Sequence, residues 1–326
     1  MFIDYKSSSV RFSGRFAELN NTMTTTANGS YFEVAFKGEY ILLKFDLEGQ
    51  AYPYPHLWIQ LDEGAWIETQ LDWCLRINAV SGGLHKVKAV LKSTMEMQTR
   101  WTVPISAKLS FAGAEADEAG VLPEDNRKII EIIGDSITEG VLVDPDNQPI
   151  QPETSCRTFQ DDVFATYGYI TAQNLNLKSY HFGYGYLGFT HGGMGGVPAI
   201  NDSYDYCFDG APVTYTHPDY ILINLGTNDR AGKAEDYIRE YKRFLNHLIK
   251  VRPNSKIIVL TGFSGVFPKE TEEMVSSFNK EHKTDVFFID STGWIPPQPL
   301  HPMRDGHKTV ARHLTEILKE KYFSDM

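Results

Sequence analysis

The sequence predicts two domains, an all-β sandwich or jelly roll followed by an α/β domain with a central parallel sheet. At 326 residues the chain is longer than one typical domain. Strand patterns with a period of two occupy residues 1–112, and apolar runs alternate with helical patterns over residues 128–326. Between them, residues 113–127 are rich in Ala, Gly and acidic side chains, and we expect a linker there.

The first domain is expected to consist of antiparallel strands with one face in water. Short apolar and aromatic runs between Gly, Asp and Asn signals occur at residues 31–36, 40–45 and 57–62. Residues 85–92 alternate, so that Val87, Ala89 and Leu91 face one way while Lys86, Lys88 and Lys92 face the other. This period of two over several segments predicts a sandwich or jelly roll, and this half shows no helical period.

The second domain shows a different pattern. Continuous apolar runs, typical of buried parallel strands, occur at residues 129–133, 220–224, 256–260 and 286–290. Amphipathic helical patterns occur at residues 234–250, 271–282 and 306–322. Strands that alternate with helices predict a parallel sheet covered by helices, and in such sheets functional groups gather at the carboxyl ends of the strands.

The composition excludes several classes of partner. The formal net charge of −11 argues against a nucleic-acid backbone or an anionic membrane surface, and no stretch is long and apolar enough to span a bilayer. The first residues lack a basic head followed by an apolar core, so no secretory signal is visible. We therefore expect a cytoplasmic protein if this N-terminus is native, and a secreted or periplasmic one if a signal was removed. Cys74, Cys156 and Cys207 are expected to be buried thiols.

Four motifs that follow predicted strands carry the functional prediction. They are Gly134-Asp135-Ser136, residues 183–190 (GYGYLGFT), Gly226-Thr227-Asn228-Asp229 and residues 300–307 (LHPMRDGH). A serine hydroxyl becomes a nucleophile when a base such as His301 takes its proton. The backbone N–H groups of Ser136 and Gly188 and the Asn228 side chain could stabilise the oxyanion of a tetrahedral intermediate. These residue types predict acyl-transfer chemistry.

The order of these four motifs resembles the SGNH (GDSL) hydrolase superfamily, from about Lys128 to the C-terminus. A β-sandwich ahead of such a domain, with RFSGRF at residues 11–16 and GGLHKVKAVLK at residues 82–92, is similar to the second carbohydrate-esterase family, whose members remove acetyl groups from sugars. The resemblance implies a three-layer α/β domain, Ser136 as nucleophile and His301 as base. It further implies an oxyanion hole of Ser136, Gly188 and Asn228, with Gly185 as the alternative to Gly188.

The sequence departs from the superfamily three residues before the histidine, where most members carry Asp and this chain carries Gln298. Gln298, or a backbone carbonyl, could accept the His301 Nδ1–H and hold the tautomer. Asp290 and Asp305 are alternative acids. The departure favours a Ser–His dyad, as in some sugar esterases of the second family. Asp135 and Asp229 are expected to hold loops by accepting backbone N–H bonds.

The sequence thus predicts a serine esterase that removes O-acetyl groups from sugars or oligosaccharides. Two alternatives stay open: a weakened hydrolase that only binds carbohydrate, and an acyltransferase with the same centre. Trp294, in the loop that carries His301, is a candidate for stacking on a sugar ring. Neither a cofactor nor a metal is expected, because GYGYLG is not followed by a helix pattern and no acidic or His cluster has metal spacing. The oligomeric state stays open.

Overall fold

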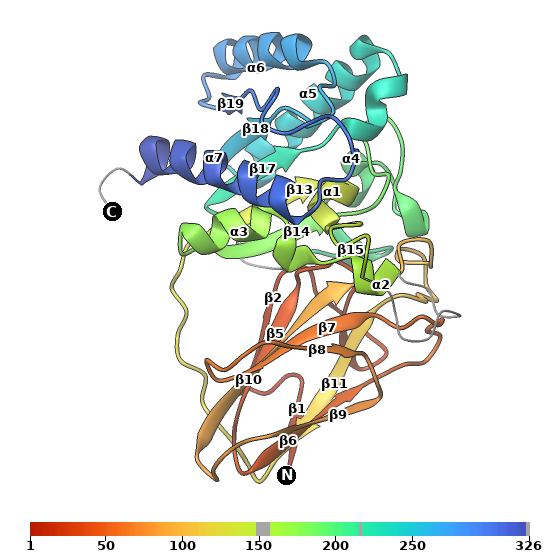
Figure 1. Cartoon of the computed structure of the whole chain (residues 1–326), viewed down its shortest axis with the longest axis vertical. Helices are drawn as coiled ribbons and strands as arrows, with labels where there is room; N and C mark the ends of the chain where they lie inside the picture. Colours follow the sequence, from red (N-terminus) through yellow and green to blue (C-terminus); the bar gives the residue numbers. More distant parts are fainter. Residues whose placement is uncertain (148–156, 215–216, 324–326) are drawn as a thin grey trace.

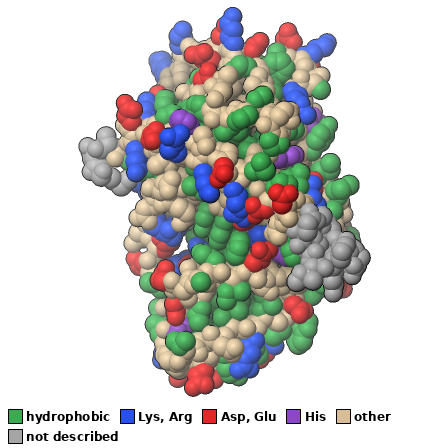
Figure 2. Space-filling model, viewed as in Figure 1, with side chains coloured by type: hydrophobic (Ala, Val, Ile, Leu, Met, Phe, Trp, Pro, Cys, Tyr) green, Lys and Arg blue, Asp and Glu red, His purple; other side chains and the backbone are tan. Residues whose placement is uncertain are grey.

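The computed structural model describes residues 1–147, 157–214 and 217–323. Figure 1 shows two domains stacked along the long axis, with the N-terminal strands in one half and the parallel sheet and helices in the other. The predicted order of an all-β domain before an α/β domain is confirmed. In the seam between the two domains, Figure 2 shows a group of hydrophobic side chains at the surface.

The N-terminal domain is a sandwich of two six-stranded antiparallel sheets. One sheet has the order β3-β4-β11-β6-β9 with β1 paired to β11, and the other has the order β12-β5-β10-β7-β8 with β2 paired to β5. The strands are β1 (Phe2–Asp4), β2 (Val10–Ser13), β3 (Ala17–Leu19), β4 (Thr22–Thr25), β5 (Tyr31–Lys37), β6 (Tyr40–Phe45), β7 (His56–Leu61), β8 (Ile67–Gln70), β9 (Cys74–Asn78), β10 (Leu84–Ser93), β11 (Leu109–Glu115) and β12 (Glu118–Ala119).

Strand β10 shows how the alternating pattern builds the sandwich core. Val87, Ala89 and Leu91 are fully buried between the sheets, as their spacing predicts. Lys92 on the opposite face was expected in water and is buried instead. Its ammonium group donates to the Thr158 carbonyl at 2.9 Å and pairs with Glu68 at 2.9 Å. The prediction is wrong here because the second domain covers this end of the sheet.

The segment expected as a linker, residues 113–127, belongs in part to the sandwich. Strand β11 continues to Glu115 and pairs with both β1 and β6, and β12 pairs with β5. Ala, Gly and acidic residues have low β-propensity, which hid these strands from the sequence pattern. Pairing with neighbouring strands outweighs that propensity, so the connection between the domains is confined to residues 120–128.

The second domain is built on a five-stranded parallel sheet of order β14-β13-β17-β18-β19. Its strands are β13 (Ile129–Gly134), β14 (Lys178–Gly183), β17 (Tyr220–Asn224), β18 (Lys256–Leu260) and β19 (Phe287–Ile289). In β17, Ile221 and Ile223 pack in one apolar cluster, and Tyr220 and Leu222 pack in another on the opposite face. Both faces of the sheet are therefore covered, which is why its strands are continuous apolar runs.

Helices cover the two faces of this sheet. Side chains of α5 (Ala234–Val251) and α6 (Pro268–His282) fill one apolar cluster, and those of α3 (Tyr167–Asn174) and α7 (Arg304–Tyr322) fill the other. The predicted helices over α5, α6 and α7 are confirmed, whereas α3 was not predicted. The remaining elements are α1 (Ser136–Glu139), α2 (Arg157–Gln160), α4 (Ile200–Ser203), the two-stranded β15 (Tyr206–Phe208) and β16 (Ala211–Pro212), and the 3-10 helices η1 (Val163–Ala165), η2 (Met194–Gly196) and η3 (Thr227–Ala231).

Two buried arginines of the sandwich domain pair with carboxylates of the second domain. Arg15 donates to Glu131 of β13 at 2.9 Å, and neither side chain is exposed. Arg100 pairs with Glu139 of α1, again with both side chains buried. Buried charges are tolerated only when they are compensated, so these pairs fix how the two domains meet.

Two further sequence expectations concern membrane spans and cysteines. Within the described ranges, no helix is both long and apolar enough to cross a membrane. Cys207 is a buried free thiol, as expected, whereas Cys74 is a free thiol that is only half-buried. Cys156 lies outside the described residues.

Candidate active site

Ser136 lies at a tight turn between β13 and α1. The Asp135 side chain caps α1 by accepting from the Ile137 N–H at 3.0 Å. Gly134 has no room for a side chain, because a Cβ there would lie 2.1 Å from Thr138 Oγ1 and 2.6 Å from the Asn224 carbonyl oxygen. The glycine lets the strand turn directly into the helix and present Ser136 at the carboxyl end of the sheet.

His301 lies in the loop before α7, and its ring reaches the serine. Nε2 of His301 and Oγ of Ser136 are 2.8 Å apart, within hydrogen-bond distance. The two residues are 165 positions apart in the chain, yet both come from loops at the same edge of the sheet. Ser136 is buried but keeps 7% of its surface exposed.

The loop that carries His301 is fixed by contacts just after it. Arg304, the first residue of α7, pairs with Asp144 and donates to Asp162 at 2.8 Å. His307 is buried and its Nδ1 accepts from the Tyr167 N–H at 3.1 Å. These contacts tie the start of α7 to α3 and to the segment after α1, and so anchor the loop that carries His301 at its C-terminal end.

Asn228 and Asp229 lie in η3, which follows β17, the strand next to β13. One N–H of the Asn228 amide donates to the Leu187 carbonyl at 3.0 Å, which leaves its second N–H for another acceptor. The Asp229 carboxylate accepts from the backbone N–H groups of Phe189 at 3.0 Å and Thr190 at 2.9 Å. The expectation that Asp135 and Asp229 hold loops by accepting backbone N–H bonds is therefore confirmed.

The backbone amides of the loop after β14 differ in whether they are already bonded. The N–H of Gly188 donates to the His191 carbonyl at 3.2 Å, and the N–H of Gly185 donates to Glu139 Oε2 at 2.5 Å. The N–H groups of Tyr186 and Ser136 donate to no other described residue. Tyr186 has φ = 65°, a conformation that non-glycine residues rarely adopt. No sequence pattern pointed to Tyr186.

None of the acids or amides considered for His301 contacts it. Gln298 is exposed, and within the described part of the chain it forms no hydrogen bond with His301. Asp290 accepts from the Thr292 N–H at 2.9 Å, and Asp305 pairs with Lys308 at 3.3 Å. Nδ1 of His301 likewise has no hydrogen-bond partner among the described residues, so neither Gln298 nor a backbone carbonyl holds the tautomer here.

The electrostatic environment of His301 includes a residue of the sandwich domain. Burial lowers the pKa of His301, and the cations Arg157 and Arg230 lower it further, whereas the Glu96 carboxylate raises it. Glu96 follows β10 of the sandwich domain and pairs with Arg157 at 2.9 Å. The sequence contained no signal for this arrangement, because Glu96 and His301 belong to different domains.

Two buried carboxylates, Asp135 and Glu139, lie close to Ser136 in the sequence. Burial raises the pKa of Asp135 to about 6. Burial also raises the pKa of Glu139, against the opposing effect of the Arg100 guanidinium. Glu139 accepts from the Gly185 N–H while it pairs with Arg100. The sandwich domain therefore holds the loop after β14 through Glu139.

The aromatic candidate Trp294 packs within the protein. Its ring centroid lies 5.0 Å from that of His313 on α7, and the ring packs against the apolar cluster that α3 and α7 form with the sheet. Its role as a sugar-stacking residue stays a prediction. Within the described residues, no group of three or more His, Cys, Asp or Glu side chains could hold a metal ion.

Two curated proteins are similar to this chain in sequence. The chain is 27% identical over 237 residues to the cellulase/esterase CelE of Acetivibrio thermocellus, an alignment that covers 66% of this chain and 28% of that protein. It is 26% identical over 258 residues to an acetylxylan esterase / glucomannan deacetylase of Cellvibrio japonicus, covering 74% of this chain and 68% of that one. The chain thus spans less than a third of the first relative's length.

The fold and the family agree with these relatives. The structure is similar to that of a family two carbohydrate esterase from Cellvibrio japonicus, with a TM-score of 0.79, 18% identity, and coverage of 98% of this chain and 97% of that chain. The model of the GDSL-like Lipase/Acylhydrolase family matches residues 132–309, which include Ser136, Asn228 and His301. Since that match spans more than half of the 326 residues, the chain belongs to the GDSL-like lipase/acylhydrolase family.

Proposed function

We propose that this protein is a serine esterase that removes O-acetyl groups from sugars or oligosaccharides. The observation that carries the proposal is the 2.8 Å contact between Ser136 Oγ and His301 Nε2 at the carboxyl edge of the sheet. The names of the two relatives, an esterase joined to a cellulase and an acetylxylan esterase, support carbohydrate esters as the substrate class.

The reaction would proceed through an acyl-enzyme. His301 takes the Ser136 proton while Oγ attacks the acetyl carbonyl carbon, and the carbonyl oxygen becomes an oxyanion. His301 then protonates the sugar oxygen, the ester bond breaks, and acetyl-Ser136 remains. Water attacks this ester with His301 again as base, His301 returns that proton to Ser136 Oγ as the acyl bond breaks, and acetic acid leaves, which ionises to acetate. The two attacks, by Ser136 on the ester and by water on acetyl-Ser136, need His301 neutral at their start, which its lowered pKa favours near pH 7.

The oxyanion would be stabilised by the Ser136 N–H and the Asn228 amide, both of which have a free N–H in the described residues. The third donor comes from the loop after β14. Gly188 stays our sequence-based candidate, but its N–H must first leave the His191 carbonyl. The Tyr186 N–H needs no such rearrangement, and its strained φ is of the kind found at functional turns.

The absence of an acid on His301 makes a Ser–His dyad the proposed catalytic unit. An acid in a triad orients the base and stabilises its protonated form. Here orientation would come from the packing of the loop, through Arg304 and His307. Among the described residues, the charge of protonated His301 would be stabilised by Glu96, which is partly neutralised by Arg157.

The test is hydrolysis of 4-nitrophenyl acetate, butyrate and octanoate by the wild type and by Ser136→Ala. We expect activity that falls with acyl length and a loss in the variant of at least about 10³-fold in kcat. Release of acetate from acetylated xylo-oligosaccharides would then establish the substrate class. Activity that survives in Ser136→Ala would contradict the proposal. Acetyl transfer to an added sugar in preference to water would indicate an acyltransferase, and binding without turnover a carbohydrate-binding protein.

A further inference from the structure

We propose that a cavity beside the His301 loop is the subsite for the sugar ring that carries the acetyl group, with Gln298 and Asp146 as its specificity-determining residues. This inference rests on the proposed function and names the part of the molecule that would recognise the alcohol half of the ester. It also assigns a role to Gln298, which stands where most members of the superfamily that the sequence resembles carry Asp.

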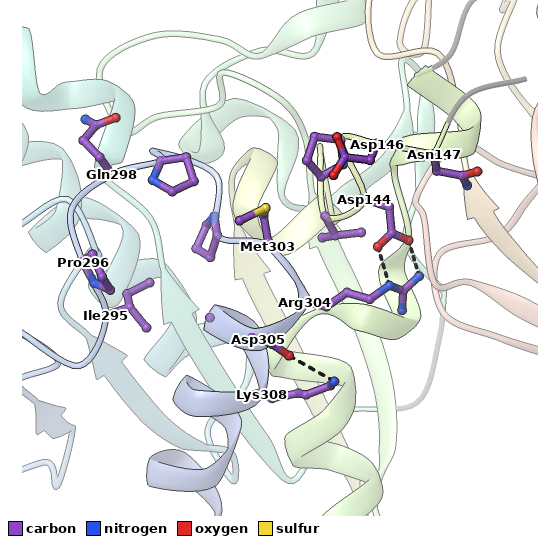
Figure 3. A pocket seen from close by; sticks show the side chains of 15 residues that line it. Asp144, Asp146, Asn147, Ile295, Pro296, Gln298, Met303, Arg304, Asp305 and Lys308 are labelled. Atoms are coloured by element: carbon purple, nitrogen blue, oxygen red, sulfur yellow. Dashed lines mark hydrogen bonds and ion pairs between the residues drawn. The ribbon is translucent and has the colours of Figure 1, made fainter.

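The cavity has a volume of about 720 Å³, within the range typical of small-molecule sites. Figure 3 shows its three walls. One is the segment after α1, residues 143–147, the second is the loop of residues 295–303, and the third is the start of α7 at residues 304–308.

The cavity lies beside the loop that carries His301, although neither Ser136 nor His301 is among its lining residues. Pro299 and Pro302, which lie two residues before and one residue after His301, both line it. Val143, on the opposite wall, follows shortly after the helix that begins at Ser136. A ring in this cavity would therefore lie beside the loop of His301, the group that must protonate the departing sugar oxygen.

The lining combines an apolar surface with two polar side chains that have no partner among the described residues. Ile295, Pro296 and Met303 supply the apolar part. Gln298 and Asp146 lie on opposite sides in Figure 3, both are exposed, and neither forms a hydrogen bond or ion pair with another described residue. The other charged lining residues are paired, Asp144 with Arg304 and Asp305 with Lys308.

A pyranose matches this lining in chemistry. Its C–H faces can pack on the apolar side chains, and its hydroxyls can donate to Asp146 and both donate to and accept from Gln298. A long acyl chain would leave the unpaired Asp146 carboxylate buried without a partner, which costs free energy. A phosphorylated ligand would meet the same carboxylate as a like charge. The lining thus favours a neutral ligand rich in hydroxyls.

This assignment predicts a different behaviour for Gln298 than a role in orienting the base would. A base-orienting side chain acts on every ester that Ser136 attacks, so its loss lowers kcat for all of them alike. A side chain that binds the sugar acts only on sugar esters, and its loss raises KM for those. The ratio of the two activities therefore separates the two roles.

The experiment compares the full-length wild type, Gln298→Ala and Asp146→Asn on acetylated xylo-oligosaccharides and on 4-nitrophenyl acetate. Gln173→Ala, an exposed glutamine on α3, is the matched control. For Gln298→Ala we expect the ratio of kcat/KM on the sugar ester to kcat/KM on 4-nitrophenyl acetate to fall about tenfold, mainly through KM, as the loss of one hydrogen bond predicts. For Asp146→Asn we expect a fall in the same direction, and for the control an unchanged ratio.

Equal losses on both substrates, or an unchanged ratio in both pocket variants, would overturn the inference. Either result would leave the esterase proposal intact, since the wild type would still hydrolyse both esters. A wild type that hydrolyses neither ester, or does so without Ser136, would instead overturn the proposed function and with it this subsite. Because both varied side chains are exposed, their replacement does not threaten the fold.

Discussion

The buried pair of Arg15 and Glu131 allows a quantitative test of how the two domains are joined. Neither side chain is exposed, and the guanidinium also donates to the Tyr204 carbonyl at 2.6 Å. The other Glu131 oxygen accepts from the Tyr204 hydroxyl at 2.7 Å. The perturbation is Arg15→Met, which keeps much of the side-chain volume but removes the charge from the sandwich side of the interface.

The expected loss follows from the burial of the partner. Removing one member of a fully buried ion pair costs about 3–5 kcal/mol, because the other charge then stays buried without its counter-ion. That is a large part of the about 5–15 kcal/mol that stabilises a typical folded protein. Adding Glu131→Gln removes the stranded charge and keeps an acceptor for the Tyr204 hydroxyl. The double variant should therefore recover about 2–3 kcal/mol relative to the sum of the two single losses.

The assay is equilibrium unfolding in urea, followed by tryptophan fluorescence, for the wild type, both single variants and the double variant. The exposed pair of Lys6 and Glu18 supplies the control, since both side chains are at least half exposed and their replacement should leave the midpoint unchanged. Additive losses in the double variant would refute the reasoning, as would an Arg15→Met midpoint equal to that of the control.

Two further predictions concern catalysis. Since only neutral His301 can act as a base, activity should rise with pH through a pKa below about 6.5, the ordinary value. Glu96→Gln should move this midpoint of the pH–rate profile to lower pH, and Arg157→Gln should move it to higher pH. Shifts of the midpoint in the same direction in both variants would show that the pair acts only by holding the structure. Asn228→Ala should lower kcat by about 10²–10³-fold with little change in KM, as expected for an oxyanion donor. Steady-state kinetics on 4-nitrophenyl acetate measure both constants, and a change in KM alone would contradict the prediction.

Much of the fold could be predicted from the sequence because its signals are local. The period of two in β10 and the helical spacing in α5 each reflect which face of one element is buried. Strand β11 and the burial of Lys92 could not be predicted in this way. Both depend on a neighbouring element that is remote in the chain, β1 for the strand and the Thr158 carbonyl for the lysine.

At the site, the sequence by itself determined which residue types follow which strands, and therefore that Ser136, Asn228 and His301 would meet at one edge of the sheet. That follows from the topology of a parallel sheet, in which all strand ends of one kind share an edge. Only the tertiary structure decided what surrounds them. Glu96 raises the pKa of His301 because the two domains pack together, and Gln298 lines a cavity because its loop packs against other segments. The direction of an exposed side chain depends on such packing and not on its neighbours in sequence.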